Sequence, residues 1–360
     1  MTGIRSMEGV DFSGKKVLLR VDFNVELDED GKVLDRFKIE SCKEALTKIL
    51  SFPGVKVALL SHYGRPEGKR DEAYSLRALF EPAKSILGMQ FSFADDCVGA
   101  PVTDALSAMK EGEAVLLENV RFHAGEEADD EAFARELAAP FDVFVNEAFS
   151  VCHRNQASVS TITKLLPSYA GMRLLLEIAT LDSVRKRPMR PAVAIIGGAK
   201  IETKLPLIRV FEKLYDAVLV GGKVANEAID QKTVFSGNVV LPVDFRDDRL
   251  DIGAQTVIKF NQVIRYAKTI VWNGPLGKFE ERPYNAGTNS IVRSMIESGA
   301  FVVTGGGESV AVLEQMDVMD KMGFVSTGGG AMLEYMSGNE LPGLLALTGA
   351  MAGGVEENKV

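Results

Sequence analysis

The sequence predicts an α/β protein made of two doubly wound parallel-sheet domains. Short apolar runs alternate with amphipathic helical stretches, and 360 residues exceed what one hydrophobic core usually serves. Continuous rather than alternating hydrophobicity is typical of strands that are buried on both faces of a parallel sheet. The expected strands are KVLLRV (16–21), VKVALL (55–60), AVLLENV (114–120), DVFVNEAF (142–149), AVAII (192–196), DAVLV (216–220), TIVW (269–272) and AFVV (300–303).

Helices are expected between these runs. They fall at residues 40–51, 75–87, 130–139, 203–214 and 285–297. A longer amphipathic stretch at 172–186 ends at RPMRP (187–191), where two prolines stop a helix. We therefore expect a long helix and a hinge to join the two domains.

The predicted domain boundaries follow from this connecting helix. They give an N-terminal domain at 1–171, the helix at 172–187, a C-terminal domain at 188–345 and a tail at 346–360. Because the tail is poor in large apolar residues, we expect it to be loosely held.

Composition narrows the class of protein. With 46% hydrophobic and 25% charged residues, the chain has the balance of a soluble globular protein with apolar material for two cores. A net charge of −9 argues against non-specific nucleic-acid binding, which needs a basic surface. No apolar run approaches the length of a membrane span and no leader pattern opens the chain, so we expect a cytoplasmic protein without a membrane partner.

The three cysteines, Cys42, Cys97 and Cys152, lack the spacing of a zinc site or of a disulfide framework. We expect reduced thiols. Cys152 precedes His153, which suggests a nucleophile–base pair, but neighbours in sequence need not form a dyad in space. Ordinary thiols are the favoured interpretation.

Charged and polar side chains follow the expected strands of the first half. Because ligands of open parallel sheets bind beyond the carboxyl ends of the strands, these side chains are candidates for one site. Guanidinium groups pair bidentately with phosphate and carboxylate, so the set predicts a site for a compact polyanion. Each residue taken alone could be a solvated charge or an ion-pair partner, but several strand ends together favour the site. The candidates are Asp22, Asn24, His62, Arg65, Arg121, His153 and Arg154.

The second half presents adjacent glycines, which are absent from the first 196 residues. Before the tail, they occur at 197–198, 221–222, 305–307 and 328–330, mostly after an apolar run. Glycine lets backbone N–H groups approach phosphate at a strand-to-helix turn, so this half is predicted to bind a phosphate or a nucleotide. Neither GxxxxGK[ST] nor GxGxxG after a strand occurs, which disfavours a P-loop kinase and an ordinary dehydrogenase.

Taken jointly, these segments resemble the phosphoglycerate kinase family, and the match runs from residue 20 to residue 343. The segments are RVDFN (20–24), SHYGRP (61–66), LLENVRFH (116–123), GGAK (197–200), WNGPLGKFE (272–280) and STGGG (326–330). The resemblance implies a monomer with two Rossmann-like domains, the first for 3-phosphoglycerate or 1,3-bisphosphoglycerate and the second for ADP or ATP with Mg²⁺. It also implies the activity, which is reversible in-line transfer of the acyl phosphate of 1,3-bisphosphoglycerate to ADP in glycolysis, after domain closure.

The resemblance assigns roles residue by residue. The implied substrate-binding residues are Asp22, Asn24, Lys38, His62, Arg65, Arg121 and Arg154. The implied nucleotide-binding residues are Lys200, Lys204, Gly221, Gly253, Asn273, Glu280, Gly306, Gly307, Glu308 and Ser309. The implied catalytic residues are Lys38, Lys200, Gly306 and Gly329, and Glu308 is the implied protein ligand of Mg²⁺.

The chain departs from the family pattern at several of these places. Lys38 replaces an arginine and lacks its bidentate fork, and Arg36 could compensate only if the loop is reshaped. Glu308 replaces an aspartate, although its longer carboxylate can still meet Mg²⁺. Lys223 replaces a glycine at the adenine cleft, and residues 229–251 are shorter than the family segment, so we expect a more open nucleotide pocket.

The expected wall of the substrate site also differs, at Glu147, Ser150 and Gln156. These differences leave two alternatives open. One is a kinase for another small phosphorylated carboxylic acid, and the other is a non-catalytic nucleotide-binding homologue. Because so many like charges in one cleft are hard to explain without catalysis, the retained lysines and arginines favour an enzyme.

Overall fold

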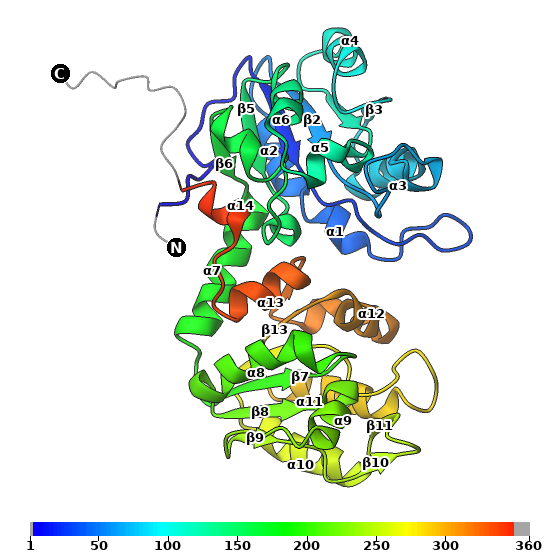
Figure 1. Ribbon diagram of the computed structural model, residues 1–360, viewed down its shortest axis with the longest axis vertical. Helices are drawn as coiled ribbons and strands as arrows, with labels where there is room; N and C mark the ends of the chain where they lie inside the picture. The colour runs from blue at the N-terminus through cyan, green and yellow to red at the C-terminus, as the bar shows by residue number, and fades with distance from the viewer. Residues whose placement is uncertain (1–2, 349–360) are drawn as a thin grey trace, which may run out of the picture. The chain divides into compact units, whose positions relative to one another are not determined.

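The computed structural model describes residues 3–348, which form two compact units (Figure 1). The first unit combines residues 3–176 with 340–348, and the second contains residues 177–339. Residues 340–345, expected in the C-terminal domain, thus belong to the first unit. There α14 (Pro342–Leu345) is held by the Gly343 N–H, which donates to the Cys152 carbonyl over 2.9 Å. Most of the expected tail at 346–360 lies outside the described residues.

The first unit is built on a six-stranded sheet in the order β3-β4-β2-β1-β5-β6, with every pairing parallel. Its central strands are continuously apolar, which matches their burial on both faces. The strands are β1 (Lys16–Arg20), β2 (Lys56–Leu60), β3 (Phe91–Ala94), β4 (Ala114–Leu117), β5 (Val143–Asn146) and β6 (Ser168–Ala170).

Helices connect these strands and cover the sheet. They are α1 (Arg36–Glu40), α2 (Lys43–Leu50), α3 (Arg77–Leu87), α4 (Ala100–Ala108), α5 (Ala124–Glu127) and α6 (Glu131–Ala138). Short 3₁₀ turns lie between them, at η1 (Glu72–Tyr74), η2 (Val120–Phe122), η3 (Phe149–Val151) and η4 (Thr161–Lys164). The helix α7 (Met172–Lys186) begins in the first unit, ends in the second and has the predicted bounds.

The second unit repeats the architecture with the order β14-β13-β12-β7-β8-β9, again parallel throughout. Its strands are β7 (Ala192–Ile196), β8 (Ala217–Val220), β9 (Val239–Val240), β12 (Thr269–Asn273), β13 (Phe301–Gly305) and β14 (Phe324–Ser326). A separate antiparallel pair is formed by β10 (Phe245–Arg246) and β11 (Asp251–Ile252).

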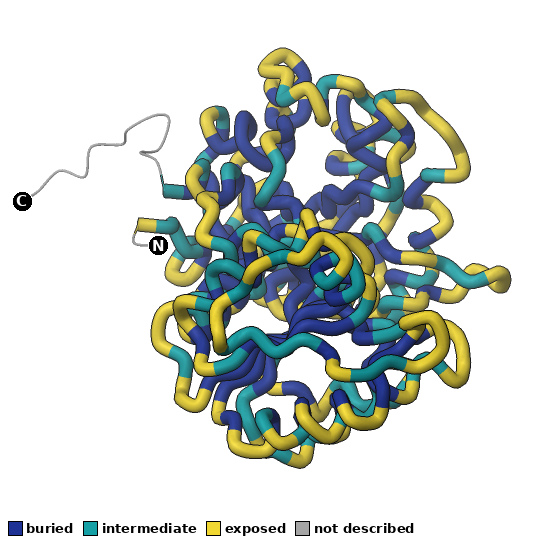
Figure 2. The backbone as a smooth tube through the Cα atoms, turned by 60° about the horizontal axis from the view of Figure 1, so that its bottom comes forward, coloured by how far each residue is buried: buried dark blue, intermediate teal, exposed yellow. Residues whose placement is uncertain are grey.

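Helices of the second unit follow the strands in the same alternation. They are α8 (Ile201–Leu214), α9 (Gly222–Asp230), α10 (Ala254–Ile264), α11 (Ala286–Glu297), α12 (Gly307–Met316) and α13 (Gly330–Met336), with η5 (Met319–Lys321) before β14. Figure 2 colours the backbone by how far each residue is buried, and shows buried strands in the interior and exposed loops at the surface. The predicted class, two parallel α/β units, is confirmed. In the described residues, no helix is both long enough and apolar enough to cross a membrane.

Candidate functional site: two anion-binding edges

The polar residues predicted in the first half lie at one edge of the first sheet. The strands β4, β2, β1 and β5 are adjacent and parallel, so their carboxyl ends meet there. Backbone and side-chain hydrogen bonds join the loops that follow. The Phe23 N–H donates to Ser61 Oγ over 2.8 Å, and the Gly64 N–H donates to Asn24 Oδ1 over 2.9 Å. This edge is therefore one connected site rather than separate loops.

Asp22 supplies the negative charge of this edge. It is 7% exposed and accepts a hydrogen bond from the Ser150 hydroxyl. Burial alone would raise its pKa, but Lys38, His62 and the Ser150 hydrogen bond outweigh burial and lower the pKa to about 2. Asp22 is therefore ionised at neutral pH and can hold the cations around it in place.

His62 is held as a neutral imidazole. Burial lowers its pKa well below the ordinary range. Asp22 opposes this shift, whereas Arg20, Arg121 and Arg154 lower the pKa further. An Arg20 guanidinium nitrogen lies 3.1 Å from His62 Nδ1. Because arginine can only donate, Nδ1 must accept, which leaves the proton on Nε2. His62 thus offers the site one neutral N–H donor.

Among the described residues, Arg121 is the clearest candidate for binding an anion. Its side chain is 2% exposed, and one terminal nitrogen donates to the Gly64 carbonyl over 2.7 Å. The other terminal nitrogen is buried with no hydrogen-bond partner. Burial, followed by repulsion from Arg154 and Arg20, lowers the pKa of Arg121 to about 10. A buried, repelled cation with an unused donor fits a phosphate or carboxylate oxygen.

Lys38 also reaches this edge, from the short helix α1. Its Nζ donates to the Asn24 carbonyl over 3.1 Å and lies 4.0 Å from Asp22 Oδ2. Arg36, the conceivable substitute, instead pairs with Glu40 on the surface and is 55% exposed. Lys38 thus joins Asp22, His62 and Arg121 in one group of charged and polar side chains, the anion-site cluster.

The remaining predicted residues of this edge are less enclosed. Arg65 is exposed on the loop after β2, while His153 and Arg154 are half-buried after η3. Arg154 is close enough to act electrostatically on Arg20, His62 and Arg121. The structure therefore groups Arg154 with the cluster and leaves Arg65 at its rim.

The first two glycine pairs of the second unit use their N–H groups in backbone hydrogen bonds, so these groups are not free to bind a ligand. The Gly197 N–H donates to the Asn273 carbonyl, the Gly198 N–H to the Pro275 carbonyl and the Gly221 N–H to the Ile196 carbonyl, each over 2.9 Å. A Cβ on Gly197 would lie 2.1 Å from the Pro275 oxygen. The expectation that these pairs present free amides is therefore wrong. They let the loops after β7, β8 and β12 touch backbone to backbone.

The later glycine clusters have the open geometry that was expected. Gly306 adopts φ +102°, and a Cβ on Gly307 or Gly329 would meet nothing within 4 Å. Neither α12 nor α13, which begin just after Gly306 and Gly329, has a side-chain N-cap. Their first N–H groups are the ones suited to phosphate.

The carboxyl ends of β7, β12 and β13 form the second edge, and Lys204 and Asn273 lie at its polar centre. Lys204 Nζ donates to Asn273 Oδ1, and Asn273 Nδ2 donates to the Gly305 carbonyl. Burial lowers the pKa of Lys204, while Glu308 in the first turn of α12 opposes that effect. Glu308 is exposed in the first turn of α12, whose N–H groups are suited to phosphate. Because Mg²⁺ prefers carboxylate oxygens, Glu308 fits the role of a Mg²⁺ ligand.

Other predicted nucleotide residues have distinct places. Ser309 Oγ accepts the Gly274 N–H over 2.8 Å, so its visible role is to join two loops. Gly253 donates to the Asp244 carbonyl, and Asp244 also caps α10 through the Gln255 and Thr256 N–H groups. Lys200 and Glu280 are exposed, and so is Lys223, which departs from the family pattern.

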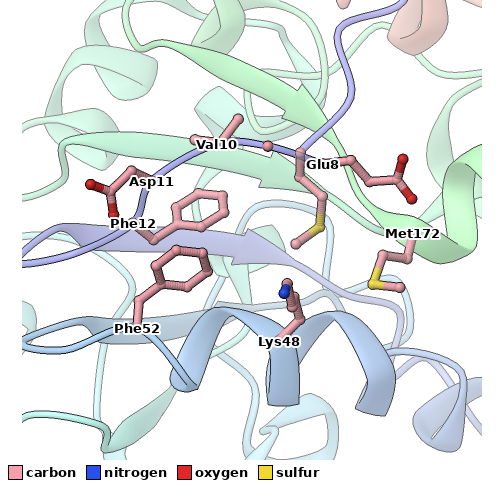
Figure 3. Close-up of a pocket in the computed structure, with 9 residues that line it drawn as sticks. Glu8, Val10, Asp11, Phe12, Lys48, Phe52 and Met172 are labelled. Atoms are coloured by element: carbon pink, nitrogen blue, oxygen red, sulfur yellow. The ribbon is translucent and has the colours of Figure 1, made fainter.

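The first unit also holds a pocket of about 480 Å³ (Figure 3). The rings of Phe12 and Phe52 pack edge to face there with their centroids 5.5 Å apart, and Lys48 Nζ lies 5.9 Å from the centroid of the Phe52 ring. None of the predicted site residues lines it. The hollow is therefore separate from the anion-binding edges.

Sequence reasoning missed residues that support these edges. Arg20 is fully buried, and its Nε donates to Ser158 Oγ over 3.2 Å. Ser158 Oγ in turn donates to Glu126 over 2.6 Å, so a buried chain holds the arginine against His62. In the second unit, the Thr327 N–H donates to Glu177 over 2.7 Å. Only the strand-end position of Arg20 could have indicated its role.

Comparison with known proteins shows which family the chain resembles. A sequence model described as "Phosphoglycerate kinase" matches residues 7–249 and 231–339. The chain belongs to the phosphoglycerate kinase family. A phosphoglycerate kinase of Bartonella henselae is 39% identical over 398 positions, covering 97% of this chain and 100% of that protein. One from Rhodospirillum centenum is 39% identical over 393 positions, covering 95% and 99%.

Solved structures of the family agree with this fold. The phosphoglycerate kinase from Coxiella burnetii has a TM-score of 0.81 at 29% identity, covering 96% of this chain and 99% of that one. The enzyme from Pyrococcus horikoshii OT3 has a TM-score of 0.85 at 28% identity, covering 96% and 98%. The 398-position alignment exceeds the 360 residues of this chain, and the two family matches overlap at 231–249. Both facts fit the prediction that the segment 229–251 is short.

Proposed function

We propose that the chain is a phosphoglycerate kinase that moves the acyl phosphate of 1,3-bisphosphoglycerate to ADP, giving 3-phosphoglycerate and ATP in a reversible, Mg²⁺-dependent reaction of glycolysis. The observation that carries the proposal is the buried Arg121, with one donor unused and with Arg154 and Lys38 in the same cluster. Such a cluster is costly unless a polyanion occupies it. Family membership supports the same reaction.

On the first unit, we assign substrate binding to the cluster around Asp22 and Arg121. Asp22 orders Lys38, His62 supplies a neutral donor, and the arginines neutralise a phosphate and a carboxylate. Asn24 and Arg65 complete the proposed set, because Asn24 joins the β1 and β2 loops and Arg65 stands at the rim.

On the second unit, we assign the nucleotide phosphates to the edge around Lys204. The uncapped starts of α12 and α13, with Gly306, Gly307 and Gly329, would receive phosphate oxygens. Lys200, exposed at the start of α8, would offset charge on the transferring group. Gly221 and Gly253 would only let the chain approach the nucleotide closely, since their amides are already used. Bound with the nucleotide at Glu308, Mg²⁺ would offset charge on the phosphate oxygens.

The proposal is tested by a coupled assay with 3-phosphoglycerate, ATP and Mg²⁺. We expect turnover that requires all three. Parallel reactions with other small phosphorylated carboxylic acids separate this proposal from the alternative kinase. Absence of turnover at millimolar substrate would overturn it.

Replacement of Lys38 by alanine is expected to lower kcat at least about tenfold, because a cation beside Asp22 is lost from the site where charge builds up in transfer. Steady-state kinetics with saturating 3-phosphoglycerate measure this. Arg36→Ala, on the same helix but paired with Glu40 at the surface, is the matched control and is expected to retain kcat. Equal kcat values for Lys38→Ala and the parent would remove Lys38 from the mechanism.

A further inference from the structure

Asp96, Cys97 and His123 bring a carboxylate, a thiol and an imidazole together in the first unit. The strands β3 and β4 are parallel neighbours, so the loops after Ala94 and Leu117 leave the sheet at the same edge. The ligand atoms of the three side chains all lie within 4.8 Å of one another. His123 Nε2 is 2.7 Å from Asp96 Oδ1.

We propose that these three residues form a binding site for Zn²⁺, separate from the phosphoryl-transfer machinery. A tetrahedral zinc ion takes N, O and S donors at about 2.0–2.3 Å, which places those donors roughly 3.3–3.7 Å apart. The donor atoms of the cluster, which lie between 2.7 Å and 4.8 Å from one another, bracket that spacing. Asp96 and His123 are 37% and 30% exposed, which gives the ion an entry path and leaves the fourth position to water.

The charge balance of the cluster favours a divalent cation. The Asp96 carboxylate and a Cys97 thiolate carry two negative charges, so a bound Zn²⁺ makes the group neutral where Cys97 is only 1% exposed. The carboxylates of Glu118 and Glu126 are also buried and act electrostatically on Cys97. The same field attracts a cation.

The arginines near the cluster make their contacts with other groups. Arg70 donates to the Asp95 carbonyl over 2.9 Å, and its guanidinium pairs with Glu72 and Glu118. Arg121, two residues before His123, donates to the Gly64 carbonyl and lies 3.5 Å from Glu127. Asp96 and Cys97 therefore keep their negative balance.

Packing holds the donors in place. The His123 ring stacks on Phe133 with centroids 5.0 Å apart and planes at 21°. Asp96 Oδ1 accepts the Cys97 N–H over 2.7 Å, which keeps the carboxylate close to the thiol. Metal binding would release the thiol proton to solvent as the Zn–S bond forms.

The site differs from the anion-binding edge in position and in chemistry. Its residues follow β3 and β4 at the outer end of the sheet, whereas the anion-binding residues follow β1, β2, β4 and β5. A bound ion would join the loop at 95–99 to the segment at 120–124. We therefore expect Zn²⁺ to raise the unfolding temperature of the chain, since the ion binds the folded form.

Titration with Co²⁺, a spectroscopic substitute for Zn²⁺, tests the proposal. We expect one equivalent of Co²⁺ to produce the near-ultraviolet band of a cobalt–thiolate bond, and Cys97→Ala to abolish it. Cys42→Ala is the matched control, because Cys42 is equally buried but donates to the Ile39 carbonyl outside the cluster. Absence of the band in the parent chain, or its persistence in Cys97→Ala, would overturn the proposal.

A second variant keeps the test decisive if Cys97→Ala fails to fold. His123→Gln retains a donor for Asp96 but removes the imidazole ligand. We expect at least a tenfold weaker affinity for Zn²⁺ in competition with a chromophoric chelator, with kcat for phosphoryl transfer unchanged. An affinity equal to that of the parent would contradict the assignment of His123.

Discussion

Replacement of Arg121 by methionine is expected to lower kcat/KM for 3-phosphoglycerate by at least about a hundredfold. The guanidinium has one terminal nitrogen buried without a hydrogen-bond partner, beside Arg154 and Arg20. Charge-assisted hydrogen bonds to phosphate are worth about 1.5–3 kcal/mol each, and a hundredfold loss corresponds to about 2.7 kcal/mol. Steady-state kinetics with varied 3-phosphoglycerate measure the effect.

The same replacement is expected to leave the fold as stable as before or more stable. Burial and like-charge repulsion lower the pKa of Arg121 to about 10, so the native state carries a cost that methionine removes. Loss of the hydrogen bond to the Gly64 carbonyl offsets part of this gain. Thermal unfolding measured beside the kinetics therefore separates a binding role from a structural one.

A matched control for this arginine lies on α6. Arg135 is 64% exposed and pairs with Glu131 one turn away, so Arg135→Met should change neither kcat/KM nor stability appreciably. Arg121→Lys should give an intermediate loss, because lysine keeps the charge but not the fork. A value of kcat/KM near that of the parent in Arg121→Met would contradict the proposed anion site.

The central strands could be predicted from sequence, whereas the strands at the sheet edges could not. The eight apolar runs correspond to β1, β2, β4, β5, β7, β8, β12 and β13. In the two six-stranded sheets, the missed strands are β3, β6, β9 and β14, and each lies at the end of its sheet. The short antiparallel pair of β10 and β11 was missed as well. An edge strand is covered on fewer sides, so its sequence need not be continuously apolar. In β3, for example, Ser92 is exposed between buried Phe91 and half-buried Phe93.

Helix prediction failed where a local hydrogen bond intervened. One helix was expected at 40–51, but α1 ends at Glu40 and α2 begins at Lys43. Ser41 Oγ donates to the Lys38 carbonyl over 2.7 Å, which satisfies a group at the end of α1 and permits the break. Such a bond depends on side-chain geometry that periodicity does not contain.

The site was predicted from the rule that ligands of parallel sheets bind beyond the carboxyl ends of the strands. That rule found Asp22, His62 and Arg121, because each follows a strand end. It missed the contribution of Arg20, because the position of Arg20 at the end of β1 does not show that the buried guanidinium turns to His62. It also assigned one role to all glycine clusters, although Gly197 packs against Pro275 and Gly307 is open. Which backbone atoms a glycine faces is a property of tertiary structure.

Replacement of Glu147 by glutamine is expected to change the pH dependence of stability more than any other single substitution considered. Glu147 is 3% exposed, and one carboxylate oxygen has no hydrogen-bond partner. The other accepts the Arg173 N–H over 2.8 Å in the first turn of α7. A Cβ on Gly171 would lie 1.7 Å from the unpartnered oxygen, so the chain packs closely around this carboxyl.

The sign of the effect follows from burial. Burial raises the pKa of Glu147 from 4.5 to about 8, against the Arg173 and Leu174 N–H groups and the Arg173 charge, while Glu44 raises it further. The native state thus favours the protonated form. This contribution is fully present below about pH 4.5 and is lost as the pH rises to about 8. At about 1.4 kcal/mol per pKa unit, the loss is on the order of several kcal/mol.

Glutamine cannot ionise, so the free energy of unfolding of Glu147→Gln should not share this decline. The decisive quantity is the difference between variant and parent as a function of pH, measured by denaturant unfolding from pH 4.5 to 9. A constant offset from the new amide does not affect that difference. Glu136→Gln, an exposed carboxylate on α6 that does not act on Glu147, is the control and should follow the parent closely. Parallel stability curves for Glu147→Gln and the parent would show that Glu147 ionises in the native state at its ordinary pKa, and that the close packing around Gly171 imposes no electrostatic cost.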